Sequence, residues 1–225
     1  NVKIKFNEYD ILQKIPMVNS KQSNAYIWLW LPGAREPTLC GQITAENQHH
    51  VFAYHSTYLA RSDAIALDPV ELPLIPGRQR SDYDIHRALR DAAPDSWGRR
   101  VILYQQQLSP NTYEEFTEIA FLLASDVNRI GALHFQSTNS HYESIDVPNV
   151  TLEQLQQVTQ KIELGAPIPS TLYAALFHGT SIGGARPKAF LNDYELPIKK
   201  QYIAKFSSQT DFFPIVKAEF AAMQL

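Results

Sequence analysis

The first part of the chain alternates apolar and polar positions with a period of two, which is typical of half-buried strands. The apolar runs are short, rich in aromatic and branched residues, and closed by turn residues such as Pro32-Gly33. Strands are expected over residues 2–6, 24–31, 39–43 and 51–54. Short strands at this spacing predict a small, mostly antiparallel β-rich unit.

Further along the chain the apolar positions recur every three to four residues, which indicates amphipathic helices. Thr151 and Gly165 stand where a helix N-cap and C-cap belong, and Asp95 is placed to cap a helix over 96–106. Other helices are expected over 83–89, after Asn111 or Thr112 through residue 123, over 170–177, and beyond residue 211 through Leu225. Strands are expected again at 187–191 and 202–206.

These elements predict an α+β fold with two parts. A small antiparallel β-rich N-terminal subdomain is expected over residues 1–108, and a unit of helices and strands over 109–225. The boundary between them is best placed at Pro110-Asn111, because proline and asparagine favour turns.

Composition narrows the functional classes. With 44% hydrophobic and 19% charged residues, the 225-residue chain has the balance of an ordinary soluble protein. A net charge of −3 argues against broad nucleic-acid contact by this chain alone. The single cysteine, Cys40, excludes an internal disulfide and is expected to be buried. No run reaches the ~18 apolar residues of a membrane helix and no signal-peptide pattern opens the chain, so cytoplasmic localisation is expected.

Candidate chemistry gathers in the last quarter of the chain. The small residues at 179–185 allow backbone N–H groups to surround an anion, because few Cβ atoms block the curve. Lys188 follows on one expected strand, Lys205 lies on the next, and Glu219 stands in the last helical pattern. Glycine turn, strand lysine and helix glutamate are the phosphate-holding parts of a protein-kinase-like nucleotide site.

Other interpretations of the glycine run fit less well. Residues 179–183 also spell G-x-S-x-G, but the last histidine, His178, precedes the serine, so the hydrolase order of Ser, acid and His cannot be completed. Neither a Walker A nor a dinucleotide-binding motif is present. A plain tight turn would explain the glycines alone, although not the lysine and glutamate that follow. Histidines 49, 50 and 55 lack the companions that a metal site requires, so no metal site is expected.

This order of parts resembles the HipA family of bacterial toxin kinases. Three segments carry the resemblance: Ser181-Ile182-Gly183-Gly184-Ala185 with Lys188, then Ile203-Ala204-Lys205-Phe206, then Ala218-Glu219-Phe220. Earlier passages are also similar to the family, namely those around Cys40-Gly41, 51–54, Pro94-Asp95, Trp97-Gly98-Arg99 and 129–133. The resemblance is most specific from Gly179 onward.

The resemblance implies ATP as the ligand. Backbone amides of Ser181, Ile182, Gly183, Gly184 and Ala185 would hold phosphates, and Lys205, steadied by Glu219, would reach the α- and β-phosphates. Lys188 either faces the phosphates or points to water, and Arg186 has no assigned role. Ser181 would also be an autophosphorylation site whose new charge competes for the same amides. Arg99 and Arg100 are interpreted as a solvated helix face, with a phosphate clamp as the alternative.

The resemblance further implies a C-terminal lobe that would hold Mg²⁺ and the catalytic aspartate, beyond residue 225. We therefore expect an N-terminal kinase lobe that does not catalyse phosphoryl transfer alone, with no catalytic residue of its own. The implied partners are a HipB-like DNA-binding antitoxin and a protein substrate such as an aminoacyl-tRNA synthetase. The apolar face of the last helix favours an oligomer or a partner chain there. The alternative function is a non-catalytic module that docks on a separate kinase or antitoxin chain.

Overall fold

The computed structural model describes residues 17–47, 49–108, 115–125, 129, 131–144, 150–178, 184–193 and 200–225. Its fold is α+β, as expected, and the chain divides into two compact units. The sheet unit comprises Val18–Ala93 and Glu114–Ser144, and the helical unit takes Pro94–Tyr113 and Ile145–Leu225 with the N-terminal Asn1–Met17. Each unit is therefore built from separate segments, whereas the sequence analysis expected one cut after residue 108. The strand expected at 2–6 lies outside the described residues.

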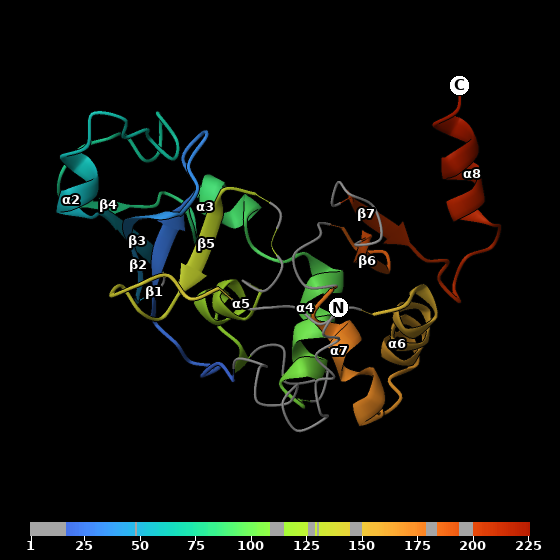
Figure 1. Cartoon of the computed structure of the whole chain (residues 1–225). Helices are drawn as coiled ribbons and strands as arrows, with labels where there is room; N and C mark the ends of the chain where they lie inside the picture. The colour runs from blue at the N-terminus through green and yellow to red at the C-terminus, as the bar shows by residue number, and fades with distance from the viewer. Residues whose placement is uncertain are drawn as a thin grey trace, which may run out of the picture. The chain divides into compact units, whose positions relative to one another are not determined.

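The sheet unit is built on a five-stranded antiparallel sheet in the order β4-β3-β2-β1-β5 (Figure 1). Neighbouring strands are mostly consecutive in sequence, so β1, β2 and β3 form a meander, and β5 joins the free edge of β1. Three of the expected strands are confirmed as β1, β2 and β3. The strands are β1 (Asn24–Leu29), β2 (Thr38–Glu46), β3 (His49–Tyr54), β4 (Arg78–Arg80) and β5 (Leu133–Gln136).

One hydrophobic core fills the sheet unit. Ile27, Ile43 and Phe52, from three adjacent strands, are fully buried, and Cys40 is buried with them as expected. The helix α5 (Glu118–Ala124) contacts β1, β2 and β5 through its apolar side. Two short helices, α2 (Ser56–Leu59) and α3 (Arg87–Asp91), complete this unit.

Helix starts differ from expectation at two places. Helix α5 begins after Thr117, whose hydroxyl accepts from the Ala120 N–H at 3.1 Å, and not after Asn111 or Thr112, which lie outside the described residues. The helix expected over 83–89 begins only at Arg87. The first expectation rested on a cap at Asn111 or Thr112, and among the described residues the α-helix begins only after Thr117.

The helical unit has its own core. The helices α4 (Ser96–Gln105), α6 (Leu152–Leu164) and α7 (Tyr173–Leu176) pack against one another, with a 3₁₀ turn η2 (Ser170–Leu172) before α7. Residues from these elements form the buried cluster, among them Trp97, Val101, Leu155, Ile162 and Leu176. Its strands β6 (Lys188–Asp193) and β7 (Lys200–Lys205) form a separate antiparallel hairpin, and β6 contacts α6.

The caps of α6 are confirmed. Thr151 and Gln154 make a reciprocal capping box, in which each side chain accepts from the backbone N–H of the other. Gly165 ends the helix with φ +65°, the left-handed conformation that glycine adopts without strain.

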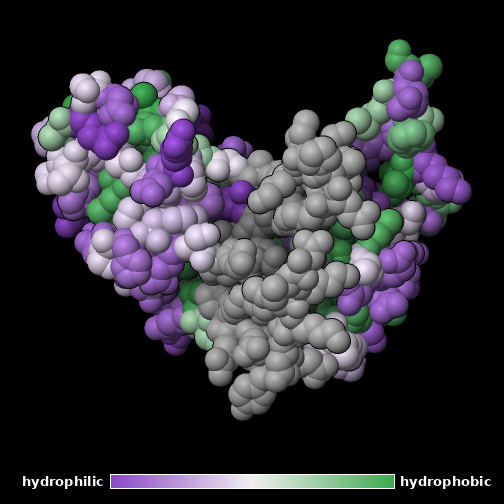
Figure 2. Space-filling view, viewed as in Figure 1, coloured by the Kyte–Doolittle hydropathy of each residue, from purple (hydrophilic) through white to green (hydrophobic). Residues whose placement is uncertain are grey.

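The last helix, α8 (Ile215–Ala222), is shorter than expected. Met223 is its C-cap, so the helix ends before Leu225. None of its residues is buried, and Phe220, Met223 and Leu225 are exposed. Figure 2 shows hydrophobic surface, in green, alternating with polar surface over this helix at the upper right. Over the part of the chain that the structure describes, no helix is long and apolar enough to cross a membrane.

Candidate functional site

The β6–β7 hairpin places two lysines directly opposite each other. Lys188 begins β6, Lys205 ends β7, and the two are paired in the antiparallel register. The N–H of Phe206 donates to the carbonyl of Pro187 at 3.0 Å, so the hydrogen-bonded ladder continues past them. Like charges at opposing positions repel each other, and this end of the hairpin therefore favours an anion nearby.

Lys205 is paired with Glu219 of α8. The lysine Nζ donates to Oε1 of the glutamate, and this is the ion pair that the sequence analysis expected. The side chains are 44% and 40% exposed, so solvent screens the pair and it adds little to stability by itself. The ion pair instead fixes the position of the Lys205 ammonium between β7 and α8.

Lys188 lies against Gly184 and does not point to water, which was one of the two orientations that the sequence left open. The residue is 9% exposed. Burial lowers the pKa of Lys188, the charge of Lys205 lowers it further, and the carboxylates of Asp95 and Glu219 partly oppose the shift. Keeping this lysine protonated therefore costs free energy that an added anion would reduce.

Gly184 is required where it stands. Its φ is +108°, which residues with a side chain rarely adopt, and a Cβ at this position would clash with the Nζ of Lys188. The absence of a side chain is what allows the lysine ammonium to lie against the backbone of the turn.

These residues line one open pocket of about 240 Å³. Five of the eight expected ATP-binding residues are among its lining, namely Gly184, Ala185, Lys188, Lys205 and Glu219. The other three, Ser181, Ile182 and Gly183, lie outside the described residues. The remaining lining residues are Arg186, Phe206, Ile215 and Val216. Arg186, which had no assigned role, pairs with Asp211 at 2.7 Å.

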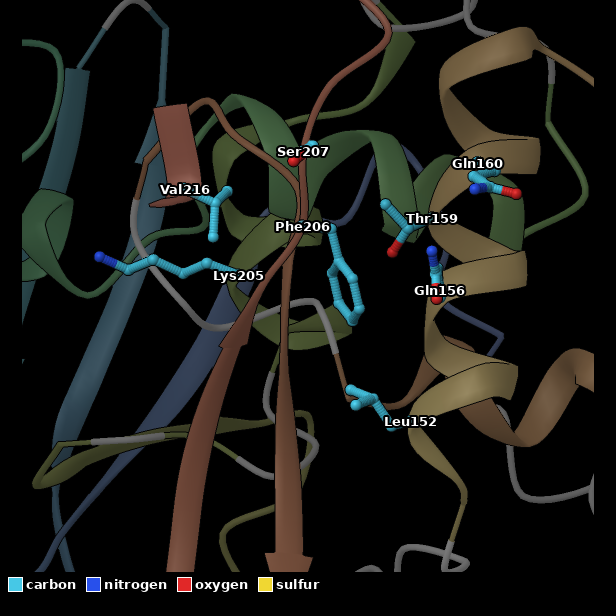
Figure 3. A pocket seen from close by; sticks show the side chains of 8 residues that line it. All are labelled: Leu152, Gln156, Thr159, Gln160, Lys205, Phe206, Ser207 and Val216. Carbon is cyan, nitrogen blue, oxygen red and sulfur yellow. The ribbon is translucent and has the colours of Figure 1, made fainter. Parts of the chain in front are cut away.

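A second hollow of about 330 Å³ lies between α6 and the end of β7. Figure 3 shows Lys205 extending away from α6, while the Phe206 ring lies on the side of α6, next to Gln156 and above Leu152. Consecutive residues of an extended chain point to opposite sides, so this strand end contributes a cation to one side and an aromatic ring to the other.

The start of α4 supports the site, which the sequence analysis did not foresee. The indole N–H of Trp97 donates to the carbonyl of Lys188 at 2.9 Å, and this hydrogen bond is buried. The Gly184 N–H donates to the carboxylate of Asp95. Asp95 is the N-cap residue of α4, at the position expected from the sequence, but its side chain makes no cap hydrogen bond. The resemblance of residues 94–99 to the HipA family was the sequence signal that could have indicated these contacts.

Arg99 also corrects the sequence interpretation. It is 4% exposed and its Nε donates to the carbonyl of Pro94 at 2.9 Å, so it is not part of a solvated face. The neighbouring Arg100 is exposed. Arg99 thus braces the turn into α4 that presents Asp95.

No group of three or more His, Cys, Asp or Glu residues is placed to hold a metal ion, within the residues that the structure describes. The pocket lining carries the ammonium groups of Lys188 and Lys205, the guanidinium of Arg186 and the carboxylate of Glu219. Such a combination attracts and orients an anion with several oxygens.

A known family model matches part of the chain. Residues 34–136 match the family model described as the HipA N-terminal domain. This portion of the chain is HipA-like. The HipA N-terminal domain match begins after β1, includes β2 to β5 together with α4, and stops before β6 and the pocket. No curated protein matches the chain significantly.

Proposed function

We propose that the helical unit is the phosphate-binding part of a HipA-like serine/threonine protein kinase and that its ligand is ATP. The observation that carries the proposal is the Lys205–Glu219 ion pair at the rim of the pocket that Gly184 and Lys188 also line. Protein kinases use such a strand lysine, paired with a helix glutamate, to hold the α- and β-phosphates below a glycine-rich loop.

The residues present fit a polyphosphate. Two ammonium groups stand opposite each other on the hairpin, and that of Lys188 lies against Gly184. A phosphate would also reduce the penalty on Lys188, whose pKa burial and Lys205 hold below its ordinary value. Bound ATP would supply the transferable phosphoryl group. The role of this chain is to bind and orient the phosphates, and we propose that Mg²⁺ and the attacking hydroxyl are held by a further lobe.

The proposal extends to the reaction partners that the family implies. The protein substrate would be phosphorylated on serine or threonine, an aminoacyl-tRNA synthetase being one such target. A HipB-like DNA-binding antitoxin would be the regulatory partner. Ser181 would be the autophosphorylated residue, since phosphate on the glycine turn would compete with ATP for the same backbone amides.

The test is a calorimetric titration of the chain with ATP and, separately, with inorganic tripolyphosphate. Lys205→Ala is expected to weaken the binding of both ligands about tenfold or more, since a charge-assisted contact to phosphate contributes roughly 1.5–3 kcal/mol. Glu219→Gln should weaken binding less, because the lysine remains. Circular dichroism would verify that each variant is folded.

Lys217→Ala is the matched control. Lys217 is exposed on α8, two residues from Glu219, and does not line the pocket. This variant removes one lysine charge, as Lys205→Ala does, but from the exposed side of the helix that carries Glu219, and it should bind both ligands as the wild type does. Absence of wild-type binding, or equal losses in the Lys205 and Lys217 variants, would contradict the proposal.

A second candidate function rests on where the family match lies. It covers residues 34–136, which include most of the sheet unit and none of the pocket-lining residues, so a non-catalytic module that docks on a separate kinase or antitoxin chain is compatible with it. In that case the chain would bind neither ATP nor tripolyphosphate, and the same titration separates the two candidates.

A further inference from the structure

Asp95 is the N-cap residue of α4, but its carboxylate contacts another segment of the chain. Its backbone is extended, with φ −74° and ψ 179°, as an N-cap residue requires, and aspartate is among the preferred residues at that position. No side-chain cap hydrogen bond is made. The carboxylate instead accepts a hydrogen bond from the backbone N–H of Gly184, 89 positions along the chain.

The hydrogen bond to Asp95 occupies the backbone N–H of Gly184, which would hold phosphate in the proposed site. Gly184 belongs to the glycine turn, and the Nζ of Lys188 lies where a side chain of residue 184 would begin. The carboxylate of Asp95 is also one of the negative charges that act on Lys188. Asp95 therefore presents an anion to both a backbone donor and a cation that would otherwise meet a phosphate.

We propose that Asp95 is a positioning residue that holds the glycine turn through the Gly184 N–H and is displaced from it by an incoming phosphate group. This inference rests on the proposed function, whose regulation it describes. One N–H cannot donate fully to two anions, and a carboxylate beside a phosphate repels it. Binding therefore has to overcome the carboxylate, and Asp95 lowers the affinity of the pocket for phosphate.

After displacement, the Asp95 carboxylate could accept hydrogen bonds from the first turn of α4. The first backbone N–H groups of α4 lack a side-chain cap from Asp95, and an aspartate at this position can accept from the second or third of them. Rotation of one side chain would exchange the bond to Gly184 for a cap on α4. The new cap on α4 would offset part of the free energy lost when the hydrogen bond to Gly184 breaks. Phosphate binding would therefore also stabilise the start of α4.

The test measures tripolyphosphate and ATP binding by Asp95→Asn. The asparagine oxygen can still accept from Gly184, but the negative charge is gone. We expect about fivefold tighter binding of both ligands, the factor that corresponds to one charge interaction at about 4 Å in a water-like dielectric. Asp95→Ser, another uncharged residue favoured at helix starts, should also tighten binding. It serves as the second variant if the asparagine form folds poorly.

Glu153→Gln is the control for net charge. Glu153 lies in the first turn of α6 and is exposed, so its loss changes the formal charge equally without removing a group from the turn. Its affinity should equal that of the wild type. A second readout is the amide resonance of Gly184 in ¹⁵N NMR. In the wild type it should shift when tripolyphosphate is added, and Asp95→Asn should reach the same bound position at lower ligand concentration.

The outcomes separate the two proposals. If the wild type binds and both Asp95 variants bind equally or more weakly, Asp95 only stabilises the turn and the present inference is overturned while the proposed function stands. If neither the wild type nor the Asp95 variants bind either ligand, both are overturned. Tighter binding by the Asp95 variants, with Glu153→Gln unchanged, supports the displacement.

Discussion

At the scale of single residues, the site depends on groups whose surroundings change their chemistry. Lys188 is a buried cation, and it lies against Gly184, whose φ of +108° favours glycine. The same physics acts in the sheet unit. His86 is 1% exposed at the start of α3, and burial lowers its pKa, while the Glu71 carboxylate and the Gln79 backbone oppose the shift. Burial penalises the charged form in each case.

His86 should make the sheet unit less stable in acid. Its folded pKa lies below the ordinary value of 6.5, so between these values the unfolded chain binds more protons. The histidine's contribution to stability is therefore complete above pH 6.5 and declines as pH falls through that window. The free energy of unfolding, measured by urea denaturation, should fall as the pH is lowered from 7. We expect this fall to be smaller in His86→Gln than in the wild type.

His141→Gln controls for the histidine prediction. His141 belongs to the same unit and its side chain is 68% exposed. The variant should keep the pH dependence of the wild type, and an equal change in both variants would contradict the assignment to His86.

At the scale of elements, local signals placed the helix caps and strands, and close packing between strands imposed further requirements. Thr151 and Gly165 bound α6 as the sequence predicted, because caps act within a few residues of the helix end. Gly41 on β2 is different. A Cβ there would lie 2.7 Å from the Phe52 ring and closer still to the Ala53 carbonyl oxygen of β3. That requirement comes from the neighbouring strand.

Gly41→Ala should lower the free energy of unfolding by about 2–3 kcal/mol, the usual cost of overpacking a core, because the Ala53 carbonyl belongs to the backbone and cannot rotate away. Urea denaturation monitored by tryptophan fluorescence measures the change. Thr38→Ala, at the half-buried start of the same strand, should cost less than about 1 kcal/mol. A loss in Gly41→Ala no larger than in the control would show that the strands separate easily.

At the scale of the whole molecule, the residues that the structure describes form two hydrophobic cores and leave the last helix exposed. The cores belong to the sheet unit and the helical unit respectively. Helix α8 contributes no buried residue, and Phe220, Met223 and Leu225 are 65%, 75% and 110% exposed. Apolar surface of this kind favours contact with another chain. We therefore keep the prediction that α8 is covered by an oligomer contact or a partner.

Replacement of Phe220 and Met223 together by serine should reduce concentration-dependent self-association, which sedimentation velocity measures, because it removes apolar surface from α8. Val70→Ser is the control, since Val70 is an equally exposed apolar residue of the sheet unit, at 82%. Self-association that persists in the α8 variant, or that disappears in the Val70 variant, would contradict a role for α8.

The sequence by itself determined what depends on neighbours along the chain. Periodicity and caps indicated the strands β1 to β3 and the helices α4 and α6, and the order of glycine turn, Lys205 and Glu219 indicated a paired lysine beside Gly184. Each of these signals acts over a few residues or follows from residue order.

Only the tertiary structure decided which distant groups meet. It placed Asp95 on the Gly184 N–H, Trp97 on the Lys188 carbonyl and Arg99 in the interior, although each had a plausible local interpretation. A residue such as Asp95 can cap its own helix or bond to another segment at similar cost, so local pattern cannot choose between them. The choice depends on the packing of α4 in the core of the helical unit, which the linear sequence does not display.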